Sequence, residues 1–98
     1  MKNGKGKIYN KKGNLIFDGE YLIGMRNGKC KEYNGNEKLI FEGIYLYGHK
    51  KEGKKFFKNG KIEYEGEYLF DKKWNGKEYG EIIRTINNDI EKKRFKKI

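Results

Sequence analysis

Few side chains in this 98-residue chain could carry out covalent chemistry. It contains no serine, so Cys30 and His49 are the only residues that could form a nucleophilic pair. Cys30 falls in a predicted strand and His49 follows Gly48 in a predicted loop, which does not favour a working pair. One Cys and one His also show no zinc-ligand spacing. We therefore predict a non-catalytic protein without a metal or a cofactor.

Three carboxylates alternate along one predicted strand face, at Glu63, Glu65 and Glu67. Such a ladder could bind a metal ion. Glutamates on a solvated strand face also pair with lysines of the neighbouring strands, here Lys54 and Lys77. We favour this second interpretation.

Basic residues recur at equivalent positions of a sequence repeat. The formal net charge of +10 indicates an anionic partner, unless the lysine excess is only compositional. Loops at equivalent repeat positions project from one edge, so their cations would form a stripe that suits a phosphate-bearing surface. Solvated loops and a solvated tail are the alternative. The predicted anionic-surface residues are Arg26, Lys50, Lys51, Lys72 and Lys73 in loops, and Lys92, Lys93, Arg94, Lys96 and Lys97 in a basic tail.

A six-residue cassette that occurs three times must position these side chains. Phe17–Leu22 returns as Phe41–Leu46 and as Tyr64–Leu69, and the cassette glycines are 24 and then 23 residues apart. A fixed period in this range indicates a repeat architecture in which neighbouring units bury each other's apolar faces. Within each cassette, aromatic residues and glycine alternate with other, mostly acidic, residues, which is typical of a half-buried strand.

A Lys-rich segment follows each cassette. Gly28–Tyr33 matches Gly4–Tyr9, and the segments that begin at Gly53 and Gly76 are shortened versions. Asn-Gly is the strongest short-range turn signal. It occurs at Asn3-Gly4, Asn27-Gly28, Asn34-Gly35, Asn59-Gly60 and Asn75-Gly76. The pattern predicts an all-β antiparallel meander of about seven strands, two per repeat.

A glycine within a strand weakens it and needs a structural reason. We expect each cassette glycine to leave room for the ring of the tyrosine two residues later on the same face, as Tyr45 follows Gly43. A side chain at Gly43 would then overpack the ribbon.

These repeats resemble MORN (membrane occupation and recognition nexus) repeats, in which aromatic residues alternate with glycine and further glycines follow. The similarity runs from Gly4 to about Tyr79, and bacterial YwqK-type antitoxin proteins share a similar hairpin cassette. The matching residues are Phe17, Gly19, Tyr21, Gly24 and Gly28, then Phe41, Gly43, Tyr45, Gly48 and Gly53, then Tyr64, Gly66, Tyr68, Trp74 and Gly76.

The chain departs from the MORN pattern in two ways. Asp71 stands where the third copy should have a glycine. The Gly-x-Gly of the second strand is kept only at Gly4–Gly6, with Cys30, Lys55 and Glu78 in place of the second glycine elsewhere. On this alignment, the missing glycines argue against the tight curvature of the family in the later repeats.

The resemblance divides the chain into a repeat domain, residues 1–79, and a capping segment with a basic tail, residues 80–98. The repeat domain comprises a partial repeat (1–14) and three repeats (about 15–38, 39–61 and 62–79). The spacing of Ile82, Ile83, Ile86 and Ile90 suits a short helix, but residues 82–86 equally suit a last strand.

The resemblance implies an elongated β-hairpin scaffold. Our first hypothesis is a scaffold for protein–protein interaction or homodimerisation, through its aromatic face or open ends. The alternative is a peripheral module that binds anionic phospholipids through the basic loops and tail. A remote alternative, single-stranded nucleic-acid binding, needs exposed rings. The single cysteine and the lack of a long apolar run predict a cytoplasmic protein, membrane-associated if it binds lipid.

Overall fold

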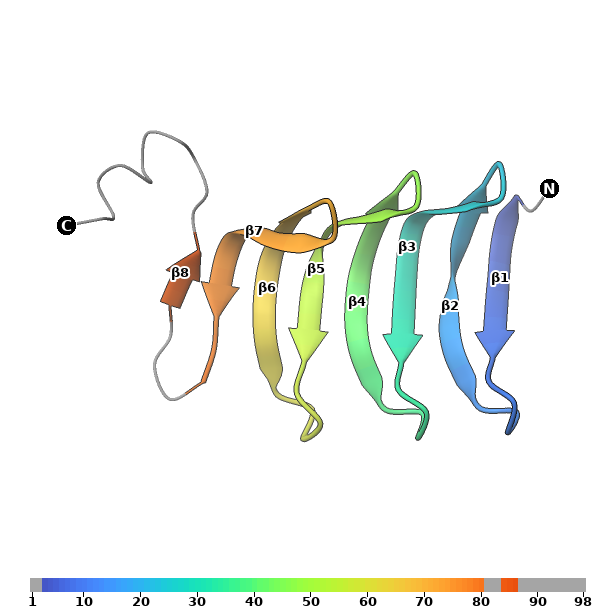
Figure 1. The fold of residues 1–98 in the computed structure, drawn as a ribbon, viewed down its shortest axis with the longest axis horizontal. Helices are drawn as coiled ribbons and strands as arrows, with labels where there is room; N and C mark the ends of the chain where they lie inside the picture. Colours follow the sequence, from blue (N-terminus) through green and yellow to red (C-terminus); the bar gives the residue numbers. More distant parts are fainter. Residues whose placement is uncertain (1–2, 81–83, 87–98) are drawn as a thin grey trace.

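The computed structural model describes residues 3–80 and 84–86, which form one open antiparallel sheet (Figure 1). The predicted all-β meander is confirmed, and each strand pairs with its neighbours in sequence. The eight strands are β1 (Gly4–Tyr9), β2 (Leu15–Leu22), β3 (Met25–Tyr33), β4 (Leu39–Leu46), β5 (His49–Phe56), β6 (Ile62–Leu69), β7 (Lys72–Glu78) and β8 (Arg84–Ile86). No helix among the described residues is long and apolar enough to span a bilayer.

The C-terminal alternatives resolve in favour of a strand where the structure describes the chain. Residues 84–86 form β8, which pairs with β7, and Ile86 packs against the core. Ile82, Ile83 and Ile90 lie outside the described residues.

The strands end in two rows of turns, here called the upper and the lower edge, and the hairpins turn differently in the two rows (Figure 1). These rows run across the strand ends and are distinct from the edge strand β1. At the upper edge, two-residue turns join β2 to β3, β4 to β5 and β6 to β7. At the lower edge, longer turns follow β1, β3 and β5. Of the Asn-Gly pairs, only Asn34-Gly35 and Asn59-Gly60 lie in these turns, whereas Asn27-Gly28 and Asn75-Gly76 lie within β3 and β7. The turn prediction for the latter two pairs was wrong.

A row of glycines crosses the middle of the sheet at right angles to the strands. The register aligns one residue from each of seven strands. These residues, the glycine row, are Gly6, Gly19, Cys30, Gly43, Gly53, Gly66 and Gly76. Only Cys30 interrupts it. The alignment that placed Lys55 and Glu78 at the second glycine was therefore wrong, because Gly53 and Gly76 occupy that position.

The glycine row lets neighbouring backbones approach closely and receive a ring. A Cβ atom on Gly43 would lie 2.6 Å from the Cα of Gly53 and 2.9 Å from Cζ of Phe41, and would also clash with the carbonyl oxygen of Glu52. The ring over each cassette glycine thus belongs to the preceding aromatic residue, not to the following tyrosine as predicted. Bulges beside the row, such as the one between Ile44 and Tyr45, add twist and bend the strands.

The inner face of this bent sheet holds the core. Phe17, Phe41 and Tyr64 are at most 1% exposed. Neighbouring rings meet edge to face, with centroids 5.3–6.2 Å apart, in the order Tyr21, Phe17, Tyr45, Phe41, Tyr68, Tyr64. Each such contact contributes about 0.5–1.5 kcal/mol beyond its buried area, so this continuous chain of rings links the repeats.

The outer face carries a row of alternating charge beside the glycine row. In register order, this charge row consists of Lys7, Asp18, Lys31, Glu42, Lys54, Glu65 and Lys77. Glu65 stands opposite Lys54 and Lys77 of the neighbouring strands, as predicted, and its carboxylate accepts a hydrogen bond from the Tyr79 hydroxyl. Glu63, however, does not belong to this face: a register shift between Lys55 and Phe56 accompanies its turn toward the inner face, where it contacts Lys73.

Candidate functional site

Three cations at equivalent repeat positions lie over the rings of the inner face. The Arg26 guanidinium is 3.9 Å from the Phe17 centroid. The Lys50 ammonium is 4.7 Å from that of Phe41, and the Lys73 ammonium is 5.4 Å from that of Tyr64. A cation over a ring contributes about 0.5–2 kcal/mol, depending on its desolvation. These cations therefore cap the core from the solvent side.

In the first repeat, the cation is part of a complete hydrogen-bond network. The Tyr45 hydroxyl donates to Glu32 Oε2 at 2.6 Å and accepts from Arg26 Nη1 at 3.4 Å. Burial lowers the pKa of Arg26, but the hydrogen bond to Tyr45 and the charges of Tyr45 and Glu32 outweigh it and raise the pKa overall. Burial and the bond to Glu32 raise the pKa of Tyr45. Arg26 is thus a fixed, paired charge.

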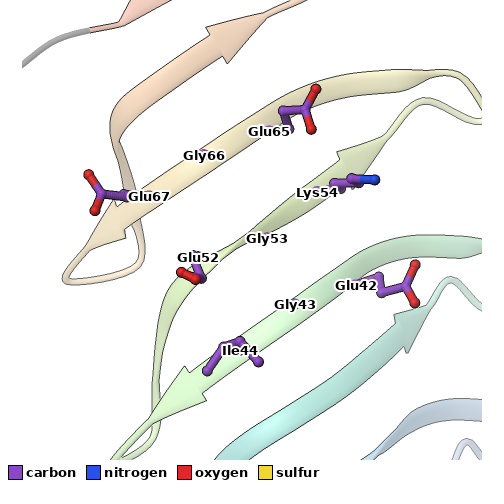
Figure 2. Close-up of a pocket in the computed structure, with 9 residues that line it drawn as sticks. All are labelled: Glu42, Gly43, Ile44, Glu52, Gly53, Lys54, Glu65, Gly66 and Glu67. Atoms are coloured by element: carbon purple, nitrogen blue, oxygen red, sulfur yellow. The ribbon is translucent and has the colours of Figure 1, made fainter.

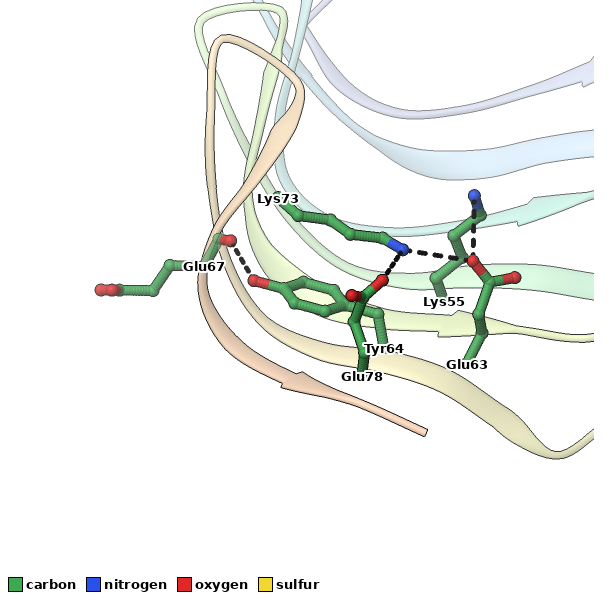
Figure 3. A network of polar contacts seen from close by, with 6 residues as sticks. All are labelled: Lys55, Glu63, Tyr64, Glu67, Lys73 and Glu78. Atoms are coloured by element: carbon green, nitrogen blue, oxygen red, sulfur yellow. Dashed lines mark hydrogen bonds and ion pairs between the residues drawn. The ribbon is translucent and has the colours of Figure 1, made fainter. Parts of the chain in front are cut away.

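The third repeat pairs its cation even more fully (Figure 3). Lys73 Nζ lies 2.8 Å from Glu78 Oε2 and 3.3 Å from Glu63 Oε2, and Glu63 also meets Lys55 at 3.4 Å. Burial lowers the pKa of Lys73, but its hydrogen bonds to Glu78 and Glu63 outweigh this and raise it. The Tyr64 hydroxyl donates to the Glu67 carbonyl at 2.5 Å.

The middle repeat lacks the corresponding acid. Lys55 occupies the inner position that Glu32 has in the first repeat and Glu78 in the third. The buried Tyr68 hydroxyl, equivalent to that of Tyr45, has no hydrogen-bond partner among the described residues. The polar network is therefore complete at both ends of the core and incomplete in its middle.

The five cations predicted to form a stripe in loops lie in strands instead. They belong to strands β3, β5 and β7, because the upper turns contain only two residues each. Arg26, Lys50 and Lys73 are half-buried over rings, and only Lys51 and Lys72 are exposed. The tail cations Lys92, Lys93, Arg94, Lys96 and Lys97 lie outside the described residues.

Apolar side chains, not cations, dominate the upper edge. Exposure reaches 57% at Tyr47 and 76% at Phe70. Adjacent upper turns are two strands apart, about 10 Å. The exposed apolar residues at and beside the three turns, here called the tip ridge, are Leu22, Ile23, Met25, Leu46, Tyr47, Leu69 and Phe70. Apolar residues scattered singly on a surface are ordinary, but here they recur at all three upper turns.

The first residue of each upper turn adopts an unfavourable backbone conformation. Ile23, Tyr47 and Phe70 have φ angles of 51°, 48° and 51°. Turns of this geometry prefer Asn, Asp or Gly, and a bulky residue there is strained. Hydrogen bonds to the preceding repeat hold two of them: the amides of Ile23 and Tyr47 donate to the side-chain oxygens of Asn3 and Asn27, at 2.6 and 2.8 Å.

A shallow pocket of about 250 Å³ opens between the second and third tips. Leu46, Leu69 and Phe70 provide apolar walls, and Lys51 lies at the pocket. Beside it, Asp71 accepts hydrogen bonds from the Lys50 amide and pairs with the His49 ring, both at 2.7 Å. This pocket would accept an apolar side chain next to an acidic one.

The outer face has a larger open groove of about 540 Å³ (Figure 2). Gly43, Gly53 and Gly66 form its floor, so backbone lies bare between two rows of side chains. Glu52 and Glu67 face each other across β5 and β6, a destabilising like-charge pair. Nevertheless, no group of three or more metal-binding side chains occurs within residues 3–80 and 84–86 that could hold an ion.

Cys30 and His49 are not brought together. Cys30 is buried in the glycine row on β3, whereas His49 is exposed at the upper end of β5, with β4 between them. Burial raises the pKa of the Cys30 thiol to about 12. A thiol that keeps its proton at neutral pH is a poor nucleophile.

Comparisons with protein-family models, curated proteins and solved structures gave no match for this chain. The site must therefore be judged on its own geometry. Sequence reasoning identified the core aromatics and missed the tip ridge. A signal was present: the dipeptides Ile23-Gly24 and Tyr47-Gly48 follow equivalent leucines at the repeat period of 24 residues.

Proposed function

We propose that this chain is a non-catalytic, MORN-like scaffold that binds a protein partner through its tip ridge. The observation that carries the proposal is the row of exposed apolar residues held in strained turns at the repeat period. Strain that the fold does not need is characteristic of functional surfaces. The partner would supply apolar side chains that cover the tips, with an acidic residue near Lys51.

The inner face supports this assignment, because the aromatic rings that the sequence suggested as a partner contact are buried there. Phe17, Phe41 and Tyr64 are buried beneath Arg26, Lys50 and Lys73, so these three rings are not accessible to a partner. The same burial argues against nucleic-acid binding through the core rings, which would require them to stack on bases. The upper edge is where large apolar side chains remain accessible.

A lipid surface is the second candidate, favoured by the aromatic tips at Tyr47 and Phe70 beside exposed Lys51 and Lys72. Aromatic side chains prefer the bilayer interface, and each nearby cation adds about 1 kcal/mol on an anionic membrane.

Photo-crosslinking in cells tests the protein proposal. A photoreactive residue at position 47 should crosslink to one discrete partner, whereas the same residue at Lys12 on the lower edge should not. The crosslink should disappear in the variant Ile23→Asn/Phe70→Asn. It should persist in the matched variant Tyr9→Asn/Phe57→Asn, which removes exposed apolar residues from the lower edge.

Equal crosslinking from both edges would overturn the protein proposal. The lipid candidate is tested by flotation with vesicles of phosphatidylcholine, alone or with phosphatidylserine. Binding only to the anionic vesicles, lost in Ile23→Asn/Tyr47→Asn/Phe70→Asn, would support lipid and displace the protein assignment.

A further inference from the structure

The glycine row and the charge row end at β1, an edge strand whose sequence resembles that of an interior strand. β1 carries Gly6 in the glycine row and Lys7 in the charge row. Its sequence matches that of β3, which has neighbours on both sides. Among the described residues, β1 pairs only with β2.

Interior Lys-rich strands show what a second neighbour provides. On β3, Lys31 stands between Asp18 and Glu42, and the Lys31–Glu42 ion pair measures 3.9 Å. On β5, Lys54 likewise stands between Glu42 and Glu65. Lys31 and Lys54 therefore have a carboxylate on each side, whereas Lys7 faces only Asp18 and Lys77 lies between Glu65 and Thr85.

The glycine row and the position of Ile8 indicate which other residues a second strand beside β1 would carry. Gly53 lies between Gly43 and Gly66, with no room for a Cβ atom. The position equivalent to Ile8 in β5 is Lys55, which lies between Phe41 and Tyr64. The Lys-rich strands β3 and β5 are thus flanked on both sides by the order aromatic, acid, glycine, whereas β7 has this order only on the β6 side.

We propose that β1 binds an extended segment of another polypeptide with this aromatic–acid–glycine order, which adds to the sheet as an antiparallel strand. The segment would place its acid opposite Lys7, its glycine opposite Gly6 and its aromatic residue opposite Ile8. Outward backbone N–H and C=O groups of β1 supply the hydrogen bonds, and the alternating side chains supply the selectivity.

Charge makes a second copy of β1 a poor occupant. Antiparallel pairing of two β1 strands around Gly6 would place Lys5 of one copy opposite Lys7 of the other. Like charges directly opposite each other are destabilising, and edge lysines commonly prevent such association. An acidic strand converts the same lysines into cross-strand pairs.

The test uses a peptide of residues 61–69, which carries the required order at Tyr64, Glu65 and Gly66. Amide hydrogen exchange of the whole isotope-labelled chain is followed by NMR at up to about 1 mM peptide, a range in which weak strand addition is measurable. Every second amide between Gly4 and Tyr9 should become protected. If the peptide instead displaced β2, β1 would still have only one neighbouring strand, and the number of protected β1 amides would not change.

Peptide variants define the specificity. Glu65→Lys/Glu67→Lys in the peptide should weaken binding about fivefold or more, and Gly66→Val about tenfold or more. In the chain, Lys5→Gln/Lys7→Gln should abolish the preference for the acidic peptide while the amides bonded to β2 stay protected.

No new protection at about 1 mM peptide, or equal protection by a scrambled peptide, would overturn the proposal. Outward amides already protected without peptide, and exposed on dilution, would show that a second copy occupies β1 instead. These outcomes are independent of the tip ridge, because β1 is the end strand of the sheet and no tip residue lies on it.

Discussion

At the lower edge of the sheet, two of the three turns place glycine where the backbone has positive φ, whereas no upper turn has glycine at its first position. In the lower turns, Gly13 and Gly60 have φ near 88°, Glu37 stands at the equivalent position of the third turn with φ 61°, and asparagine side chains cap the backbone. In the upper turns, the strained positions carry Ile23, Tyr47 and Phe70. Among the described residues, bulky apolar side chains stand at positive-φ positions in the upper turns only.

This contrast concerns which residues occupy the strained positions of the turns. A sequence selected only for stability would place Asn or Gly at all such positions. The upper edge instead keeps large apolar side chains exposed and ties their backbone to the preceding repeat through Asn3 and Asn27. Conflict with turn propensity therefore occurs at every turn of the tip ridge, and at Glu37 in one of the three lower turns.

The largest effect is expected between the two edges, at the glycine row. Gly43→Ala would press a methyl group into the Gly53 backbone and the Phe41 ring, neither of which can move without disturbing the core. We expect a loss of about 3 kcal/mol or more in the free energy of unfolding, measured with urea. Gly35→Ala is the control, because its nearest contact is a side-chain atom at 3.9 Å. Similar stability of both variants would contradict the close-packed bend.

The one non-glycine member of the row gives the next largest effect, at high pH. Cys30 keeps its proton to a pKa of about 12 in the folded chain, against an ordinary value of 9.0. The unfolded chain thus loses this proton first, and stability falls as pH rises from about 9 towards 12, by about 1.4 kcal/mol per unit. Urea unfolding of the wild type and Cys30→Ala between pH 8 and 11 measures the difference. Parallel pH profiles of the two proteins would exclude this role for the thiol.

A smaller effect is expected at a cap of the lower edge. The side-chain oxygen of Asn34 accepts hydrogen bonds from the amides of Asn36 and Lys38, at 2.8 and 3.1 Å. Asn34→Ala should cost about 1–2 kcal/mol, since two turn amides lose their acceptor. Thermal unfolding compares it with Asn36→Ala, which should change stability by less than about 0.5 kcal/mol. Equal losses would mean that the side-chain cap contributes little.

The strands and the core were predictable because they follow a strict alternation. Phe17, Phe41 and Tyr64 stand at one point of the repeat and all became buried. The register of the second strands was not predictable in the same way. Because the bulges of the two hairpins differ, the glycine row lies six residues after Gly24 on β3 but five after Gly48 on β5. Gly53 was matched to Gly28, although its structural equivalent is Cys30. Bulges result from packing across the sheet, which a linear alignment does not contain.

The candidate site was predictable only in part. The recurrence of Arg26, Lys50 and Lys73 was recognised, but not their position over rings, because sequence alone did not show that the turns contain two residues. The tip ridge was missed because Tyr47 and its equivalents are poor turn formers, so turn propensity favours the Asn-Gly pairs elsewhere. Turn propensities therefore fail to locate turns in which a bulky residue adopts a positive φ.

The smallest expected effect on stability most directly tests the contrast between the edges. Tyr47→Asn replaces a strained tyrosine with a residue that tolerates positive φ, so the free energy of unfolding should rise by about 1 kcal/mol. Crosslinking or vesicle binding through the tip ridge should weaken at the same time. Phe57→Asn on the lower edge also removes an exposed ring, but it should leave binding intact. If Tyr47→Asn lowers stability instead, the ring contributes to folding and the two edges are built by the same rule.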